Sequence, residues 1–168
     1  MRYVLLLRAV NLGPNNKVPM KDLKALLEDL GHSEVVTYLN SGNATFESAV
    51  RAVGKLATQV EDGLRERLGV DVRACVRKTA EIERALADLP ELPGYVVVNV
   101  LFDRPSPQAL KDLLATDWSP EVVVGNDQVL YCGFRDAART KLTNAVIERA
   151  LGVSATARTP ATLRKLLP

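Results

Sequence analysis

Apolar residues recur along this chain with two different periods, and the change from one period to the other predicts the order of its elements. Continuous apolar or β-branched runs indicate strands, whereas apolar positions three and four residues apart indicate helices. Pro19 opens one predicted helix and Gly31 ends it. The predicted strands are residues 3–10, 34–39, 44–47, 70–76, 95–102, 121–124, 128–132 and 153–157. The predicted helices lie within residues 19–30, 50–68, 82–89, 106–114, 138–151 and 160–167.

The order strand, helix, strand, strand, helix, strand occurs twice in this series. It predicts an α+β fold made by tandem duplication of two ferredoxin-like βαββαβ subdomains. We assign residues 1–78 to an N-terminal subdomain, 79–94 to a connecting helix and linker, and 95–168 to a C-terminal subdomain with a terminal helix. The two halves share their element order and no clear residue identity.

Two of the predicted strands are apolar without interruption, namely Tyr3–Leu7 and Tyr95–Val98. A sheet with one face in water should instead alternate apolar and polar residues. Both faces of these strands are therefore expected to be covered. Helices would cover one face, and the other half of the protein or a partner chain would cover the second. We favour packing of the two sheets on each other.

Two polar segments near the start of the chain, residues 8–18 and 40–43, are expected to meet. In a split βαβ unit the third strand lies between the first two, so the end of the first strand and the second–third hairpin share one edge. The first helix begins there, and its N-terminal amides and dipole favour anions. Since Val18 precedes Pro19, this helix has no standard side-chain cap. The candidate ligand-binding residues are Arg8, Asn11, Gly13, Asn16, Lys17, Asn40, Ser41, Gly42 and Asn43.

The residue types at this edge favour a small anionic or phosphate-bearing ligand. Arg8 and Lys17 would supply charge, the asparagines would orient the ligand, and the helix amides would contact a phosphate. A purely structural role is the alternative, because Asn and Gly commonly serve turns. A second alternative is an enzyme acting on a small phosphorylated or nucleotide substrate, with Ser41 as nucleophile and a lysine as base. The usual nucleotide-binding glycine motifs are absent, and catalytic residues stay unassigned.

Charged residues are distributed unevenly, and the C-terminal end of the chain is the most basic part. The chain is 47% hydrophobic and 25% charged, as globular proteins are, and its net charge of +2 argues against a dedicated nucleic-acid binder. Residues 135–168 nevertheless hold seven cations and two acids, whereas residues 1–134 hold fifteen cations and eighteen acids. A secondary basic site is therefore a candidate, on or just after the predicted helix 138–151. Its residues are Arg139, Lys141, Asn144 and Arg158.

RNA binding through this basic face is a further alternative. The strands lack the aromatic residues on which ferredoxin-like RNA binders stack bases, and Phe46 is alone on its strand. The sheet face is also expected to be covered. Both features argue against this alternative.

Few other residues of the chain could ligate a metal or take part in catalysis. Cys75 and Cys132 lie inside predicted strands and are expected to be reduced, buried residues. His32, the only histidine, follows a helix end and is predicted to be a surface residue. We expect no metal site and no cofactor. No stretch approaches the ~20 apolar residues of a membrane span, and no targeting segment is evident, so a cytoplasmic protein is expected. The sequence is compatible with a monomer and does not determine the oligomeric state.

Several stretches resemble one bacterial family, domain-of-unknown-function family 1697. They are Leu5–Gly13, Lys17–Leu23 and Thr37–Phe46, together with a C-terminal pattern in Ala138–Asn144 and at Glu148, Leu151, Gly152, Thr156 and Arg158. Pro14 stands where the family commonly has a second glycine, and Thr159-Pro160 where it has Asn-Trp. The resemblance implies two ferredoxin-like subdomains in tandem. Its N-terminal motifs include Arg8, Asn11, Gly13 and the Asn40–Asn43 turn, and it implies no established activity.

Overall fold

The computed structural model describes residues 1–168, which form an α+β protein with two four-stranded antiparallel sheets and six helices. Two compact units make up the chain: Met1–Arg84 with Arg164–Pro168, and Ala85–Leu163. The first unit thus takes in the last five residues, which the sequence-based division places in the C-terminal subdomain. None of the helices combines the length and apolar composition needed to cross a membrane.

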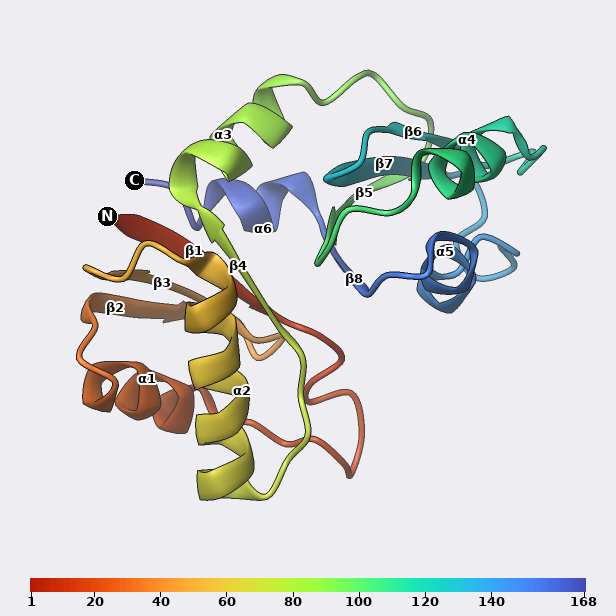
Figure 1. Cartoon of the computed structure of the whole chain (residues 1–168). Helices are drawn as coiled ribbons and strands as arrows, with labels where there is room; N and C mark the ends of the chain where they lie inside the picture. Colours follow the sequence, from red (N-terminus) through yellow and green to blue (C-terminus); the bar gives the residue numbers. More distant parts are fainter. The chain divides into compact units, whose positions relative to one another are not determined.

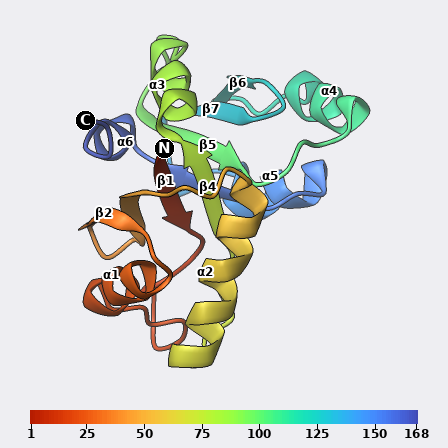
Figure 2. The ribbon, with the colours of Figure 1, turned by 60° about the vertical axis from the view of Figure 1, so that its left-hand side comes forward.

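The first unit follows the predicted element order. Its elements are β1 (Arg2–Leu7), α1 (Met20–Asp29), β2 (Ser33–Tyr38), β3 (Asn43–Glu47), α2 (Val53–Leu68) and β4 (Ala74–Lys78), followed by most of α3 (Thr79–Ala87). The sheet order is β2-β3-β1-β4, and β3 is antiparallel to both of its neighbours. The predicted position of the third strand between the first two is therefore confirmed. Helices α1 and α2 lie on one side of the sheet, and α2 runs along β4 (Figures 1 and 2).

Strand β1 is shorter than predicted, because it ends at Leu7 and not at Val10. Ala9 adopts a left-handed backbone (φ 54°), which departs from the extended conformation of a regular strand. The apolar residue Val10 is buried from a loop position, so its hydrophobicity reflects packing of the loop onto the core. Strand β4 similarly begins four residues later than predicted, at Ala74.

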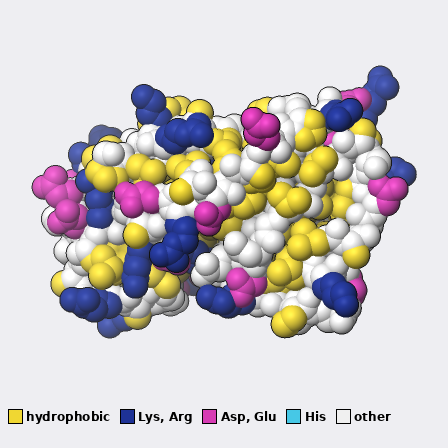
Figure 3. All heavy atoms as spheres, turned by 90° about the horizontal axis from the view of Figure 1, so that it is seen from above, with side chains coloured by type: hydrophobic (Ala, Val, Ile, Leu, Met, Phe, Trp, Pro, Cys, Tyr) yellow, Lys and Arg dark blue, Asp and Glu magenta, His cyan; other side chains and the backbone are white.

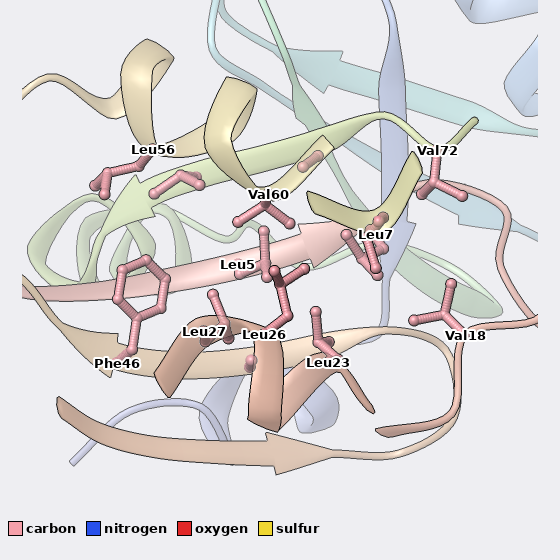
Figure 4. Close-up of a cluster of buried hydrophobic side chains, with 14 of the residues drawn as sticks. Leu5, Leu7, Val18, Leu23, Leu26, Leu27, Phe46, Leu56, Val60 and Val72 are labelled. Atoms are coloured by element: carbon pink, nitrogen blue, oxygen red, sulfur yellow. The ribbon is translucent and has the colours of Figure 1, made fainter. Parts of the chain in front are cut away.

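The core of the first unit lies between the sheet and its two helices. Tyr3, Leu5 and Leu7 belong to this core, and Figure 4 shows the apolar side chains from both helices that lie around Leu5 and Leu7. Val4 and Leu6 point to the opposite face and are fully buried as well. The prediction that both faces of this strand are covered is confirmed.

The second unit repeats the arrangement. Its elements are β5 (Tyr95–Leu101), α4 (Pro107–Ala115), β6 (Val122–Gly125), β7 (Val129–Phe134), α5 (Asn144–Leu151), β8 (Ala155–Arg158) and most of α6 (Pro160–Arg164). The sheet order is β6-β7-β5-β8, which matches β2-β3-β1-β4 position for position. Ser106 caps α4, since its hydroxyl accepts a hydrogen bond from the Ala109 amide at 3.2 Å.

Helix α5 is shorter than predicted. It begins at Asn144, where the Thr143 hydroxyl caps it by accepting from the Val146 amide. Residues 138–143 form a loop. The helix that the spacing of Ala138 and Leu142 predicts over these residues is therefore wrong. The difference moves two of the predicted basic residues off the helix.

His32 is buried, with 6% of its surface exposed, and the prediction that it lies on the surface is wrong. Its ring stacks on Phe46, with the ring centroids 4.7 Å apart, and its Nε2 has no hydrogen-bond partner. Burial lowers the pKa of His32 below the ordinary value of 6.5. The site therefore favours the neutral imidazole.

Stability of the first unit should consequently fall as the pH drops from 7 toward 5. Below pH 6.5 the unfolded chain takes up a proton on His32 that the folded chain resists, so protonation favours unfolding. Urea denaturation at pH 7 and pH 5 measures the loss. H32F keeps an aromatic ring against Phe46 and should remove this part of the pH dependence. An equal loss in wild type and H32F would assign it to other groups.

Candidate functional site

The two polar segments of the first unit meet at one edge of its sheet, and Asn11 joins them. Its Nδ2 donates to the backbone oxygen of Asn40 at 2.6 Å and to that of Val18 at 2.9 Å. Its Oδ1 accepts from the Val18 amide, also at 2.9 Å. One side chain therefore closes the loop 8–18 on itself and fastens it to the β2–β3 hairpin. The predicted meeting of residues 8–18 with residues 40–43 is confirmed (Figure 1).

The hairpin side of the contact depends on Gly42 and Asn43. The Leu7 amide donates to the Gly42 oxygen at 2.8 Å, next to the pairing of Leu6 with Asn43. Asn43 is fully buried, and its Nδ2 donates to the Tyr38 oxygen at 2.8 Å and to the Ser41 hydroxyl at 2.9 Å. These contacts shape the hairpin. They are the structural role that turn asparagines commonly have.

An open depression of about 700 Å³ lies beside this contact, at the start of α1. Asn11, Gly13 and Asn40 line it from the two predicted segments, and Leu12, Val18, Pro19 and Met20 line the rest, together with Lys17 and Lys21. Both lysines are exposed, and neither has an ion-pair partner. The depression therefore carries two positive charges.

Helix α1 adds to the positive field of the depression. Pro19 occupies its cap position with no side-chain hydrogen bond, as predicted. The first amide bonded inside the helix is that of Asp22, which donates to the Pro19 oxygen at 3.0 Å. A helix N-terminus favours an anion, and the first turn of α1 holds both the basic Lys21 and the acidic Asp22, so its own side chains bring no net charge there.

Backbone strain is concentrated at the same edge. Five residues other than glycine have positive φ, and four of them are Ala9 (54°), Asn11 (58°), Asn16 (53°) and Leu39 (60°). Asn tolerates this conformation, whereas Ala and Leu have no polar side chain that favours it. Strained backbone of this kind clusters at functional sites, where the surrounding structure holds it in place.

The predicted site residues divide into two groups. Asn11, Gly13, Lys17 and Asn40 line the depression. The others do not line it: Arg8 is half-buried at the end of β1, Asn16 holds the loop through its backbone oxygen, and Ser41, Gly42 and Asn43 form the hairpin. Lys21 was missed, although its spacing of four residues from Lys17 is a signal that the sequence contains.

The predicted basic site of the second unit is not a single basic surface. Arg139 and Lys141 lie in the loop before α5 and line a depression of about 300 Å³. Three acidic residues, Asp117, Glu121 and Asp136, line the same depression. Arg139 lies 4.0 Å from the carboxylate of Asp136. The lining therefore holds three acidic and two basic side chains, and it is not a basic surface.

The other two members of this predicted site have internal roles. Arg158 is 9% exposed, and its guanidinium donates to the Thr156 hydroxyl and to the Ala157 oxygen. Asn144 donates to Glu148 and to the Ala155 oxygen. On the face of the molecule that Figure 3 shows, Lys and Arg side chains are scattered among acidic and apolar ones. The four residues do not form the basic helix face expected from the sequence.

Comparison with known proteins agrees with the N-terminal motifs. The profile of the family described as "Protein of unknown function (DUF1697)" matches residues 1–131. The chain belongs to the DUF1697 family. The match includes the whole depression and its hairpin, and it ends before the loop that holds Arg139 and Lys141. No curated protein matches the chain.

A solved structure extends the likeness of this DUF1697 protein to the whole fold. The conserved bacterial protein SP0830 from Streptococcus pneumoniae is similar to it with a TM-score of 0.73 and 24% sequence identity. The alignment covers 98% of this chain and 96% of that one. At this identity the likeness shows a shared fold.

Proposed function

We propose that the depression at the start of α1 binds a small anionic ligand, with a phosphate group as the best match. The observation that carries the proposal is the convergence of Lys17, Lys21 and the uncapped α1 N-terminus on one open depression. Amides at a helix N-terminus are suited to phosphate oxygens, and lysines supply the counter-charge.

The test is titration of the ¹⁵N-labelled protein with inorganic phosphate and with phenyl phosphate. Binding should shift the amide resonances of Met20 and Lys21 in wild type, and added salt should weaken it. The double variant K17M/K21M removes both charges and should weaken binding at least tenfold. K24M is the matched control, since Lys24 is on the same helix, pairs with Glu28 and does not line the depression. Equal affinities of K17M/K21M and wild type would contradict the proposal.

Phenyl phosphate also tests the apolar part of the depression. Leu12, which is 82% exposed, and Met20 both line the depression. A leucine that is so largely exposed, next to two lysines, suits a ligand in which an apolar group is attached to the phosphate. Phenyl phosphate should therefore bind more tightly than inorganic phosphate. Equal affinities would restrict the ligand class to small anions.

The enzyme alternative rests on Ser41 at the same edge, and no observation favours it. The Asn43 amide donates to the Ser41 hydroxyl, and an amide donor cannot take the proton that activates a nucleophile. His32 follows the opposite end of α1. RNA binding through Arg139, Lys141, Asn144 and Arg158 also stays a prediction without support, given the acidic residues beside the first two.

We further infer that the chain is a tandem duplication of a ferredoxin-like βαββαβ subdomain. The identical strand orders β2-β3-β1-β4 and β6-β7-β5-β8 support this inference, as does the helix after the first strand of each sheet. Packing of the two sheets on each other and a cytoplasmic location stay predictions.

A further inference from the structure

The depression in the first unit is lined by cations and by no acidic side chain. Lys17 and Lys21 are exposed and line it, whereas Asp22, the next residue, does not. Residues 8–21 contain three cations and no acid, and residues 38–46 of the hairpin contain no charged residue. A surface of this composition attracts an anionic partner.

Leu12 adds a large apolar side chain to this charged surface. It lies within residues 12–17, all of which are exposed, and it lines the depression. Single exposed leucines are ordinary on protein surfaces and need no explanation. Leu12 differs from them in its position, because two lysines without ion-pair partners line the same depression.

A second exposed leucine, Leu39, lies at the same edge. It precedes Asn40, whose backbone oxygen accepts at 2.6 Å from Asn11, the neighbour of Leu12. The Leu39 backbone has a φ of 60°, a conformation that glycine or asparagine adopts more readily than leucine. Its side chain is 53% exposed, so packing offsets this cost only in part. The fold of the unit alone therefore gives no reason for a leucine at this position.

Exposed leucines beside lysines suit the interface of an anionic membrane. Aliphatic side chains enter the boundary between headgroups and acyl chains, while lysines pair with the lipid phosphates. A nucleotide suits the depression less well. None of the lining residues is aromatic, so a base would find no ring on which to stack.

We propose that the depression binds the phosphate of an anionic phospholipid in a membrane surface, with Leu12 and Leu39 inserted among the lipids. This inference rests on the proposed function, since the lipid supplies the phosphate that Lys17 and Lys21 contact. The attachment is weak and reversible, because two lysines and two leucines fall short of the two strong signals that stable anchoring requires.

Flotation of the full-length protein with vesicles is the direct test. The vesicles contain phosphatidylcholine alone, or phosphatidylcholine and phosphatidic acid in a ratio of about four to one. Wild type should float with the second kind only. Inorganic phosphate should release it more effectively than sodium chloride of the same ionic strength, because phosphate competes for the depression and sodium chloride only screens charge.

The variant L12S separates this inference from the proposed function. Since Leu12 is exposed, L12S should fold as the wild type does. Its affinity for the acidic vesicles should fall about tenfold, while its affinity for inorganic phosphate stays unchanged. V36S is the matched control and should float as the wild type does, because Val36 is an exposed apolar residue of β2 that does not line the depression.

Three results would overturn the lipid assignment and leave the phosphate site standing. They are binding of inorganic phosphate without flotation, equal flotation of L12S and wild type, and release by phosphate no greater than release by sodium chloride. Failure of inorganic phosphate to bind at all would instead contradict the proposed function, and this inference with it.

Discussion

Replacing Gly42 by alanine is expected to lower the free energy of unfolding of the first unit by about 2–4 kcal/mol. Gly42 has a φ of 83°, and an added Cβ would lie 2.7 Å from the Leu7 Cβ and 2.8 Å from the Val10 Cγ2. The cost thus has a backbone part and a packing part. Neither neighbour can move away easily, because both are buried and Leu7 is bonded to the Gly42 oxygen. Urea denaturation of the full-length protein measures the loss.

Two other glycines separate the two parts of this cost. Gly69 ends α2 with a φ of 64° and has nothing within 4 Å of an added Cβ, so G69A should cost about 1 kcal/mol from the backbone alone. Gly13 has neither a positive φ nor a close neighbour, and G13A should change stability by less than about 0.5 kcal/mol. A loss in G42A no larger than that in G69A would contradict the packing part.

The order of elements and the strand pairing of the first unit could be predicted because the relevant patterns are local. Apolar periodicity and the turn at residues 40–43 gave β2, β3 and α1 within about two residues. The predicted helix over residues 138–143 was wrong, although it also rested on a local pattern. A few apolar residues at helical spacing also arise when a loop packs onto a core, as Leu142 does. Local spacing does not distinguish these cases.

The site was predictable at the level of segments and less so at the level of side chains. Sequence gives the meeting of residues 8–18 with 40–43, since it follows from topology. Asn40 and Asn43 are asparagines of the same turn, so the sequence does not distinguish their roles. In the structure, Asn43 forms hydrogen bonds within its own hairpin and Asn40 lines the depression.

Asn11 is the residue whose replacement should most affect the candidate site. N11G removes three hydrogen bonds and keeps a residue that accepts the φ of 58°, so it isolates the side chain from backbone strain. At ~0.5–1.5 kcal/mol per bond, the expected loss of stability is about 2–3 kcal/mol. The loop should also detach from Asn40. Phosphate binding should then weaken, because the loop carries Lys17 into the depression.

An aspartate at the same position distinguishes the two ends of the Asn11 amide. N11D keeps the oxygen that accepts from the Val18 amide, and it replaces the nitrogen that donates to Val18 and Asn40 by a second acceptor. Hydrogen exchange of the Val18 amide should therefore stay slow in N11D and become fast in N11G, while both variants lose the contact with Asn40. N15G is the matched control, since Asn15 is exposed in the same loop, and it should leave exchange at Val18 unchanged. Slow exchange at Val18 in N11G would show that the loop stays in place without the Asn11 side chain. Burial of Val10 and Val18 would then be the interaction that holds the loop at this edge.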